Sequence, residues 1–257
     1  MFKTITARIQ QQHRTIRYPD GPPPPLPDRF RGRPVIDTAQ CPDGCRLCAD
    51  ACPTEAIGHD PAGTVDLGRC LFCTACAEAC PRPAITHSRN HQLAARDRGD
   101  LVVAPGTPDT AVMPAALGES IRRLFGRSLK LRQVSAGGCN ACEADTNVLG
   151  TVGWDLGRFG IQFVASPRHA DGLLVTGPVS GNMALALRKT YDALSEPRIV
   201  IACGACAISG GPYSGHAACG DGAASVVPVD LFIPGCPPHP LTILDGLLRL
   251  IGAVPEA

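Results

Sequence analysis

Short apolar runs alternate with amphipathic stretches over the second half of the chain. The runs are bounded by glycine, proline or serine, and helical periodicity between them is clearest at residues 182–194 and 241–251. Buried parallel strands that alternate with helices produce this pattern, so we expect an α/β domain with a doubly wound parallel sheet over residues 128–257. The predicted strands span residues 129–134, 161–164, 173–175, 199–202 and 226–232.

Cysteines follow three of these predicted strands directly. They lie in residues 137–142, 203–206 and 234–238, each just after an apolar run. The carboxyl ends of parallel strands form the ligand-binding edge of a doubly wound sheet. The sequence therefore predicts a cysteine-lined site at that edge.

The first half of the chain is organised differently. Residues 1–40 form a predicted arm, whose proline-rich segment 21–27 excludes helix and favours an extended path; a disordered tail is the alternative. Within residues 41–88, the sequence Cys-Pro-Thr-Glu-Ala-Ile at Cys52 returns at Cys80 as Cys-Pro-Arg-Pro-Ala-Ile, which indicates two similar half-domains. Residues 89–127 are predicted to be a linker with one short helix near residues 115–124.

The amino-acid composition limits the kinds of partner and cofactor that the chain is expected to bind. The chain has 257 residues, 14 cysteines, a formal net charge of +1 and 4% aromatic residues. The near-neutral charge and the scarcity of aromatic rings argue against nucleic acid as a partner. Residues 1–20 show no apolar core of a signal peptide, and no run approaches the roughly 18 apolar residues of a membrane span. We therefore expect a cytoplasmic protein whose thiols bind metal.

The cysteine spacing in the first half is typical of ferredoxins with two [4Fe–4S] clusters. The run Cys-x2-Cys-x2-Cys-x3-Cys-Pro that starts at Cys70 follows the bacterial pattern, in which the fourth cysteine ligates the other cluster. One predicted ligand set is therefore Cys70, Cys73, Cys76 and Cys52. The other is Cys41, Cys45, Cys48 and Cys80.

Cys41 departs from the ferredoxin pattern, because three residues rather than two separate it from Cys45. The intervening Pro42-Asp43-Gly44 can form a turn that bulges outward, so we keep Cys41 in its set. Two zinc sites of four thiolates each are the alternative, although zinc sites rarely space three cysteines at intervals of three residues.

The first half resembles the two-cluster ferredoxin-like subunit of complex I and of membrane-bound hydrogenases. Besides the cysteine pattern, Arg17-Tyr18-Pro19 and Phe30-Arg31-Gly32-Arg33-Pro34 look like the lead-in of those subunits. The resemblance implies an α+β module with two [4Fe–4S] clusters.

The second half resembles the small, single-cluster subunit shared by complex I and [NiFe] hydrogenases. The resemblance covers nearly all of residues 128–251 and includes Arg158-Phe159-Gly160, residues 166–171, Gly204-Ala205-Cys206-Ala207 and residues 234–238. It implies a flavodoxin-like fold and a third [4Fe–4S] cluster. The ligands that the resemblance implies are Cys139, Cys142, Cys206 and Cys236, with Cys203 and Cys219 as buried free thiols.

Cys139-Asn-Ala-Cys142 resembles the hydrogenase branch, because complex I subunits usually carry adjacent cysteines at this point. The resemblance thus implies the electron-transfer subunit of a membrane-bound, energy-converting [NiFe] hydrogenase of the formate hydrogenlyase type. Such a subunit has no complete active site of its own. The resemblance also suggests that Glu143 and Asp145 transfer protons. The alternative is that they are acidic residues at the beginning of a helix, stabilised there by the helix dipole.

The implied partners are a [NiFe] large subunit, membrane ion-translocating subunits, and a ferredoxin or a formate dehydrogenase. Through them the chain would lie peripherally on the inner face of the cell membrane. Three rival hypotheses remain. The first is a nickel-free, complex I-like quinone or ferredoxin oxidoreductase, and the second is a zinc-stabilised interaction protein. The third, a free-standing ferredoxin, leaves the second half of the chain unexplained.

Overall fold

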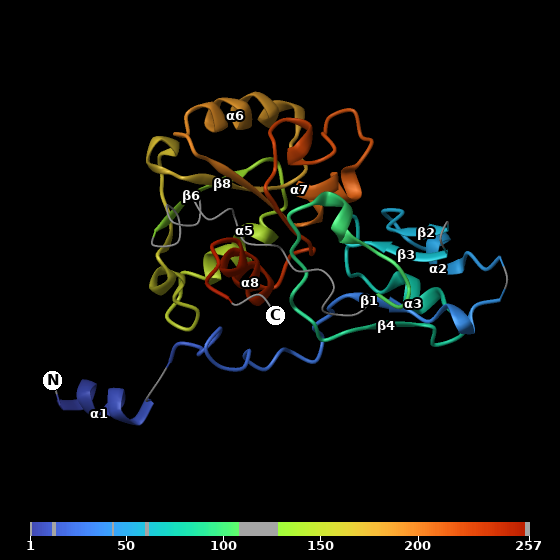
Figure 1. The fold of residues 1–257 in the computed structure, drawn as a ribbon, viewed down its shortest axis with the longest axis horizontal. Helices are drawn as coiled ribbons and strands as arrows, with labels where there is room; N and C mark the ends of the chain where they lie inside the picture. The colour runs from blue at the N-terminus through green and yellow to red at the C-terminus, as the bar shows by residue number, and fades with distance from the viewer. Residues whose placement is uncertain (1, 12–13, 43, 60–61, 108–127, 255–257) are drawn as a thin grey trace.

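A computed structural model describes residues 2–11, 14–42, 44–59, 62–107 and 128–254 of the chain. In Figure 1 the second half forms a sheet with helices on both faces, and the cysteine-rich first half packs against its side. The helix predicted near residues 115–124 lies outside the described residues.

A parallel sheet with the strand order β10-β9-β8-β6-β7 forms the centre of the second half. Its strands are β6 (Leu129–Ser135), β7 (Ile161–Phe163), β8 (Gly172–Thr176), β9 (Ile199–Cys203) and β10 (Leu231–Ile233). Counted from β6, this is the flavodoxin-like order 2-1-3-4-5, so the predicted α/β fold is confirmed. The strand order reverses between β6 and β8, which is where such sheets open a crevice for a ligand.

The last strand is shorter than the sequence pattern predicted. Residues 223–225 form a 3-10 turn and Val226 has helical backbone angles, so the apolar run reaches the sheet only at Leu231. Pro228 could not have donated a hydrogen bond to a strand ladder in any case. The predicted helices at 182–194 and 241–251 correspond to α6 (Gly181–Asp192) and α8 (Pro240–Leu250).

The sheet buries both of its faces, as a parallel sheet must. All residues of β8 and β9 are buried. Leu174, Ile201 and Ile233 pack in the core that includes the leucines of α8. Val175 and Val200 belong to the other core, together with Leu187 of α6. Figure 1 shows α6 over one face, and α5 (Ala141–Val148) with α8 over the other.

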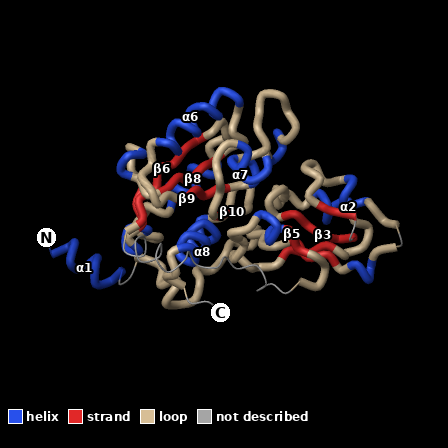
Figure 2. Tube along the Cα trace, turned by 45° about the horizontal axis from the view of Figure 1, so that its top comes forward, coloured by secondary structure: helices blue, strands red, loops and turns tan. Residues whose placement is uncertain are grey.

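The cysteine-rich half consists of two small antiparallel sheets and two short helices (Figure 2). One sheet pairs β1 (Pro34–Ile36) with β4 (Ile85–His87), and the other contains β2 (Ile57–His59), β3 (Ala62–Asp66) and β5 (Val102–Val103). The helices are α2 (Leu47–Asp50) and α3 (Ala75–Ala79). Strands β1 and β5 lie outside residues 41–88, so the folded unit extends into the predicted arm and the predicted linker on either side.

Apart from the helix at the N-terminal end of the arm, the other helices of the described residues are short. They comprise α7 (Ala205–Ser209) and the 3-10 helices Thr38–Gln40, Arg98–Leu101, Leu156–Phe159, Pro167–His169, Gly211–Tyr213 and Ala223–Ser225.

The arm begins with a helix that the sequence pattern did not predict, α1 (Phe2–Gln11). The proline-rich residues 21–27 contain neither helix nor strand. Tyr18 fixes the arm to the sheet domain: its ring is buried and its hydroxyl donates a hydrogen bond to Asp245 of α8. Asp245 also forms a buried ion pair with Arg249, 3.0 Å apart.

The two halves share one hydrophobic core rather than touching at a hinge. Ile57, Val65 and Leu67 of the cysteine-rich half pack in the same cluster as Ala202 and Phe232 of the sheet. The backbone of Ala95 also exchanges hydrogen bonds of 3.0 and 2.8 Å with Phe232, so the predicted linker extends the edge of β10. The halves are therefore held in one fixed arrangement.

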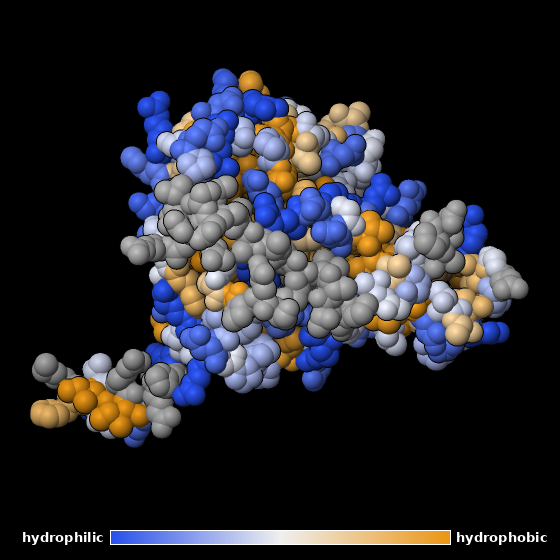
Figure 3. All heavy atoms as spheres, in the orientation of Figure 1, coloured by the Kyte–Doolittle hydropathy of each residue, from blue (hydrophilic) through white to orange (hydrophobic). Residues whose placement is uncertain are grey.

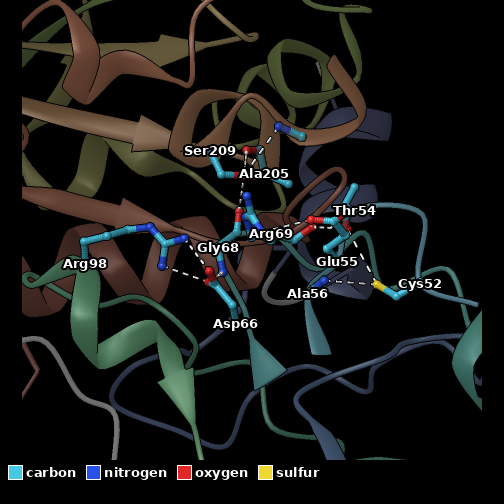
Figure 4. A network of polar contacts seen from close by, with 11 residues as sticks. Cys52, Thr54, Glu55, Ala56, Asp66, Gly68, Arg69, Arg98, Ala205 and Ser209 are labelled. Atoms are coloured by element: carbon cyan, nitrogen blue, oxygen red, sulfur yellow. Dashed lines mark hydrogen bonds and ion pairs between the residues drawn. The ribbon is translucent and has the colours of Figure 1, made fainter. Parts of the chain in front are cut away.

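Gly68 lies where the first half contacts α7 of the second (Figure 4). Ser209 at the end of α7 donates a hydrogen bond of 3.0 Å from its hydroxyl to the Gly68 carbonyl. A Cβ atom on Gly68 would lie 2.7 Å from Cγ2 of Ile208 and 2.8 Å from Cζ of Arg98. Arg98 cannot withdraw freely, because two hydrogen bonds of 2.8 and 2.6 Å tie it to Asp66. Only glycine fits here.

Among the helices of the described residues, none combines the length and the apolar composition that crossing a membrane requires.

Substitution of Gly68→Ala is expected to destabilise the docking of the two halves. The added methyl group overpacks the contact with Ile208, which costs about 1–3 kcal/mol in the free energy of unfolding. The midpoint of thermal unfolding of the anaerobically purified chain measures this. Gly99→Ala is the matched control, since a Cβ there meets nothing within 4 Å. Equal midpoints for the two variants would contradict the tight junction.

Candidate functional site

Four cysteines lie at the beginnings of short helices. They are Cys48 in α2, Cys76 in α3, Cys142 in α5 and Cys206 in α7. At the beginning of a helix, backbone amides can donate to sulfur and stabilise its charged form. The amides of Cys48 and Ala49 act in this way on the Cys48 sulfur, and their effect opposes the burial that raises its pKa. Burial likewise raises the pKa of Cys76, and a hydrogen bond from the amide of Ala77 opposes this rise.

Two Cys-x2-Cys pairs, one in each half of the chain, share the same local backbone. Thr74 follows Cys73 with φ 72°, and Asn140 follows Cys139 with φ 70°. Both lie in the left-handed region, and each precedes the first residue of a helix. Asparagine tolerates this conformation, whereas a β-branched threonine there is strained. A hydrogen bond of 2.8 Å from the Thr74 hydroxyl to Glu78 supports the strained turn.

The thiols of the first half gather into two groups. In the outer group, burial is the largest cause of a raised pKa for Cys41, and the neighbouring Cys45 and Cys80 raise it further. Cys41 and Cys45 act in the same way on Cys48. The outer group thus comprises Cys41, Cys45, Cys48 and Cys80. Three of its members, Cys41, Cys45 and Cys48, line part of a cavity of about 360 Å³.

The middle group comprises Cys52, Cys70, Cys73 and Cys76. Burial is the largest cause that raises the pKa of Cys70 to about 12, and the three other thiols of the group contribute to the same rise. Backbone amides reach two of the sulfurs: Ala56 donates to Cys52 over 3.2 Å and Phe72 donates to Cys70 over 3.3 Å. Figure 4 shows the Cys52 contact. Each group therefore contains three cysteines from one half of the sequence repeat and one from the other half, Cys80 in the outer group and Cys52 in the middle group.

A third set, the sheet-edge group, comprises Cys139, Cys142, Cys206 and Cys236. Its members follow β6, β9 and β10, so they meet at the carboxyl edge of the parallel sheet. Burial is the largest cause that raises the pKa of Cys206 to about 11, followed by Cys236 and Cys139. Cys206 and Cys236 also raise the pKa of Cys142.

Two glycines pack directly against sulfur atoms of the sheet-edge group. A Cβ atom on Gly204 would lie 2.5 Å from Sγ of Cys142, and one on Gly211 would lie 3.0 Å from Sγ of Cys206. Both glycines have positive φ, at 94° and 55°. Any side chain at either position would push into the sulfur atoms. The sequence signal for these positions was the glycine-rich setting of Cys206.

Cys203 and Cys206 differ in their surroundings. Cys203 is fully buried as the last residue of β9, and burial raises its pKa to about 12. It lies near Cys142, whose pKa it raises, but it packs within the apolar core. Cys206 is half-buried. After burial, its pKa is raised by Cys236 and Cys139, and more weakly by Cys219. The surroundings of Cys206 are those of a ligand, although its assignment stays a prediction.

The two acidic residues after Cys142 have different environments. Glu143 is 6% exposed and accepts a hydrogen bond of 2.7 Å from the hydroxyl of Thr176. Burial alone would raise its pKa, but hydrogen bonds from Ser135, Thr176 and its own amide outweigh burial and lower the pKa. Burial raises the pKa of Asp145, which faces a cavity. Proton transfer through either residue stays a prediction.

A cavity of about 230 Å³ lies where the arm, the cysteine-rich half and the sheet domain meet. Arg29, Phe30 and Asp145 line it, together with Phe72 and Cys236. Arg31 of the arm donates a hydrogen bond of 2.9 Å to the Phe72 carbonyl, beside the middle group. The sequence pattern did not predict arm residues at the site. Its only signal there was the resemblance of residues 30–34 to a known lead-in.

Cys73 and Cys236 connect the middle and sheet-edge groups across this junction. Burial is the largest cause of the raised pKa of Cys236, followed by Cys139 and then by Cys73. Phe72, the residue before Cys73, also lines the junction cavity together with Cys236, so the middle and sheet-edge groups face each other there. The three groups therefore form a row that runs from the sheet edge through the middle group to the outer group.

The donor set fits an iron–sulfur cluster in each group. Partly buried thiols that lie together raise one another's pKa, so they resist becoming thiolates unless a cation compensates their charge. Iron supplies that charge, and cysteine thiolates are the ligands that hold [4Fe–4S] clusters. Amides directed at sulfur and a largely apolar environment are features that tune such clusters.

Comparison with known proteins matches both halves. Residues 139–250 match the family model for the 20 kDa subunit of NADH ubiquinone oxidoreductase, and residues 31–84 match that of the 4Fe-4S dicluster domain. The second match identifies an iron–sulfur protein, as the cysteine spacing predicted.

Three relatives illustrate the similarity. A subunit of the NADH-quinone oxidoreductase of Desulfovibrio desulfuricans is 47% identical over 113 residues, or 44% of this chain and 61% of that protein. Formate hydrogenlyase subunit 7 of Escherichia coli is 37% identical over 164 residues, or 64% of this chain and 63% of that protein. This chain therefore spans a little over three fifths of the length of either relative.

A probable membrane-bound hydrogenase subunit of Pyrococcus furiosus is 40% identical over 126 residues, which cover 49% of this chain and 75% of that protein. The matched residues include all of the sheet-edge group, and the dicluster match adds the middle and outer groups. The chain belongs to the family of the 20 kDa subunit of NADH ubiquinone oxidoreductase, here joined in one polypeptide to a 4Fe-4S dicluster domain.

Proposed function

We propose that this chain is the electron-transfer subunit of a membrane-bound, energy-converting [NiFe] hydrogenase of the formate hydrogenlyase type. Three [4Fe–4S] clusters, when bound, would supply one-electron carriers between a [NiFe] large subunit and an external partner, a ferredoxin or a formate dehydrogenase. The outer, middle and sheet-edge groups would hold one cluster each. Ion translocation would belong to membrane subunits of the same complex.

The observation that carries the proposal is the row of three thiol groups. Phe72, the neighbour of Cys73 in the middle group, lines the same junction cavity as Cys236 of the sheet-edge group, so the two groups face each other across this cavity. A zinc-stabilised interaction protein has no need of such a row, and an isolated ferredoxin has no need of the sheet-edge group. A relay needs both features.

The protein's own part is to hold and insulate the thiolates. Amides at helix beginnings and at Ala56 and Phe72 stabilise the charge on sulfur. Leu67 and Ile208 belong to the core beside the groups and exclude water there. The contact of Gly68 with α7 keeps the helix of Cys206 at a fixed distance from the segment that leads to Cys70.

The spacing of Cys139 and Cys142 favours the hydrogenase branch over a nickel-free, complex I-like oxidoreductase. The named relatives include members of both kinds. The choice between these two candidate functions therefore depends on the large subunit, whose chemistry this chain does not contain.

Replacement of Cys206 is expected to remove the sheet-edge cluster alone. The Cys206→Ala variant should fall from about twelve irons per chain toward about eight, because a cubane loses one of its four thiolates. Iron analysis and EPR of the dithionite-reduced chain measure this. Cys203→Ala is the matched control and should keep about twelve irons and its full EPR signal. Iron loss in Cys203→Ala but not in Cys206→Ala would reverse the assignment. A colourless, zinc-containing chain would refute the clusters altogether.

The hydrogenase proposal predicts nickel in the complex that co-purifies with this chain from its native host. We expect about one nickel per complex and hydrogen-dependent reduction of a viologen dye. Elemental analysis and the dye assay test this directly. An active complex that reduces a quinone or a ferredoxin and contains no nickel would establish the complex I-like function in its place.

A further inference from the structure

Helix α1 leaves an apolar stripe uncovered. Phe2, Ile5 and Ile9 are 87%, 51% and 70% exposed. Their spacing of three and four residues places them on one face of the helix. Figure 3 shows α1 standing away from the rest of the molecule, with a run of hydrophobic surface along it. The part of the chain that the structure describes therefore leaves the stripe open to a partner.

The charge around this stripe has one sign. Residues 1–19 contain Lys3, Arg8, Arg14 and Arg17, and their first acidic neighbour is Asp20. Lys3, Arg14 and Arg17 are exposed. The whole chain is close to neutral, with a formal net charge of +1, so this segment concentrates positive charge. A partner that covers the apolar stripe would therefore lie beside a segment whose charges are all positive.

The chain just after α1 is attached to the sheet domain. The hydroxyl of Thr15 donates to the Val152 carbonyl over 3.0 Å, and the amide of Ile16 donates to the Gly153 carbonyl over 2.9 Å. Tyr18 is buried a few residues later. The base of the helix is thus anchored, while its apolar face stays free.

We propose that α1 is an interfacial anchor that lies in the surface of an anionic lipid bilayer. A helix of ten residues is about 15 Å long, half the thickness of the hydrocarbon core, so it can lie in a membrane surface but cannot cross it. Apolar residues along one face with flanking cations suit the boundary between acyl chains and anionic headgroups. The chain then contacts the membrane through its own residues as well as through partner subunits.

A second copy of the chain is the less favourable occupant. Paired helices need about three heptads to form a stable coiled coil, and α1 has ten residues. Two such segments would also bring their cations together, which opposes pairing. A lipid surface of opposite charge has neither difficulty. The inference does not depend on the identity of the large subunit, so it stands or falls separately from the proposed hydrogenase.

Vesicle flotation of the full-length, anaerobically purified chain tests the anchor. We expect reversible binding to vesicles that contain about one-third phosphatidylglycerol, and little binding to pure phosphatidylcholine. The double variant Ile5→Asp/Ile9→Asp should bind at least about tenfold more weakly, since it removes the apolar stripe. Lys3→Gln/Arg14→Gln should weaken binding by about tenfold and reduce its sensitivity to salt.

Leu185→Asp is the matched control, because Leu185 is 63% exposed on α6 and Figure 1 shows α6 on the opposite side of the molecule from α1. Its binding should equal that of the unmodified chain. All variants should keep their iron content and thermal midpoint. Three results would each overturn the proposal: no flotation of the unmodified chain, equal binding to neutral vesicles, or binding that Ile5→Asp/Ile9→Asp leaves unchanged. A dimer in solution that the same double variant dissociates would assign the stripe to a second copy.

Discussion

The contact between Gly68 and helix α7 holds the two halves of the molecule in register. It brings the backbone before Cys70 against Ile208 and Ser209, in the same short helix as Cys206. A side chain at Gly68 would require Ile208 or Arg98 to shift. Asp66 and Arg98 brace the contact from the other side. The close approach of the segment before Cys70 to α7 therefore depends on a glycine at this position.

Electrostatics explains why the thiols lie where amides and helix beginnings are available. Ionising several thiols that lie together in a half-buried pocket is unfavourable. Burial and the charges of neighbouring thiols both raise the pKa values of Cys41, Cys70 and Cys206. The protein offsets part of this through backbone amides directed at Cys48, Cys52 and Cys70. The remainder requires a cation such as iron. In this way one physical conflict accounts for both the local backbone and the cofactor.

Fusion of a dicluster domain to a single-cluster domain makes the junction between them intramolecular. Linkage in one chain raises the effective concentration of one half for the other, and the shared core then fixes their arrangement. The predicted linker is part of this core, since Leu93, Ala95 and Leu101 are buried in it. The arm crosses the same junction and places Arg31 beside Phe72. Segments that look like connectors in the sequence thus serve as the joint of the molecule.

Local periodicity and residue spacing were enough to predict the parallel sheet and the cysteines at its strand ends. They also indicated the dicluster domain, because the motif that begins at Cys70 is short and specific. The packing of Gly68 on α7, the shared cavity of Phe72 and Cys236, and the burial of Leu93, Ala95 and Leu101 became evident only in the folded chain. Helix α1 and the late start of β10 escaped prediction as well. The junction contacts join residues more than a hundred positions apart, and contacts of that range leave no periodic trace in the sequence.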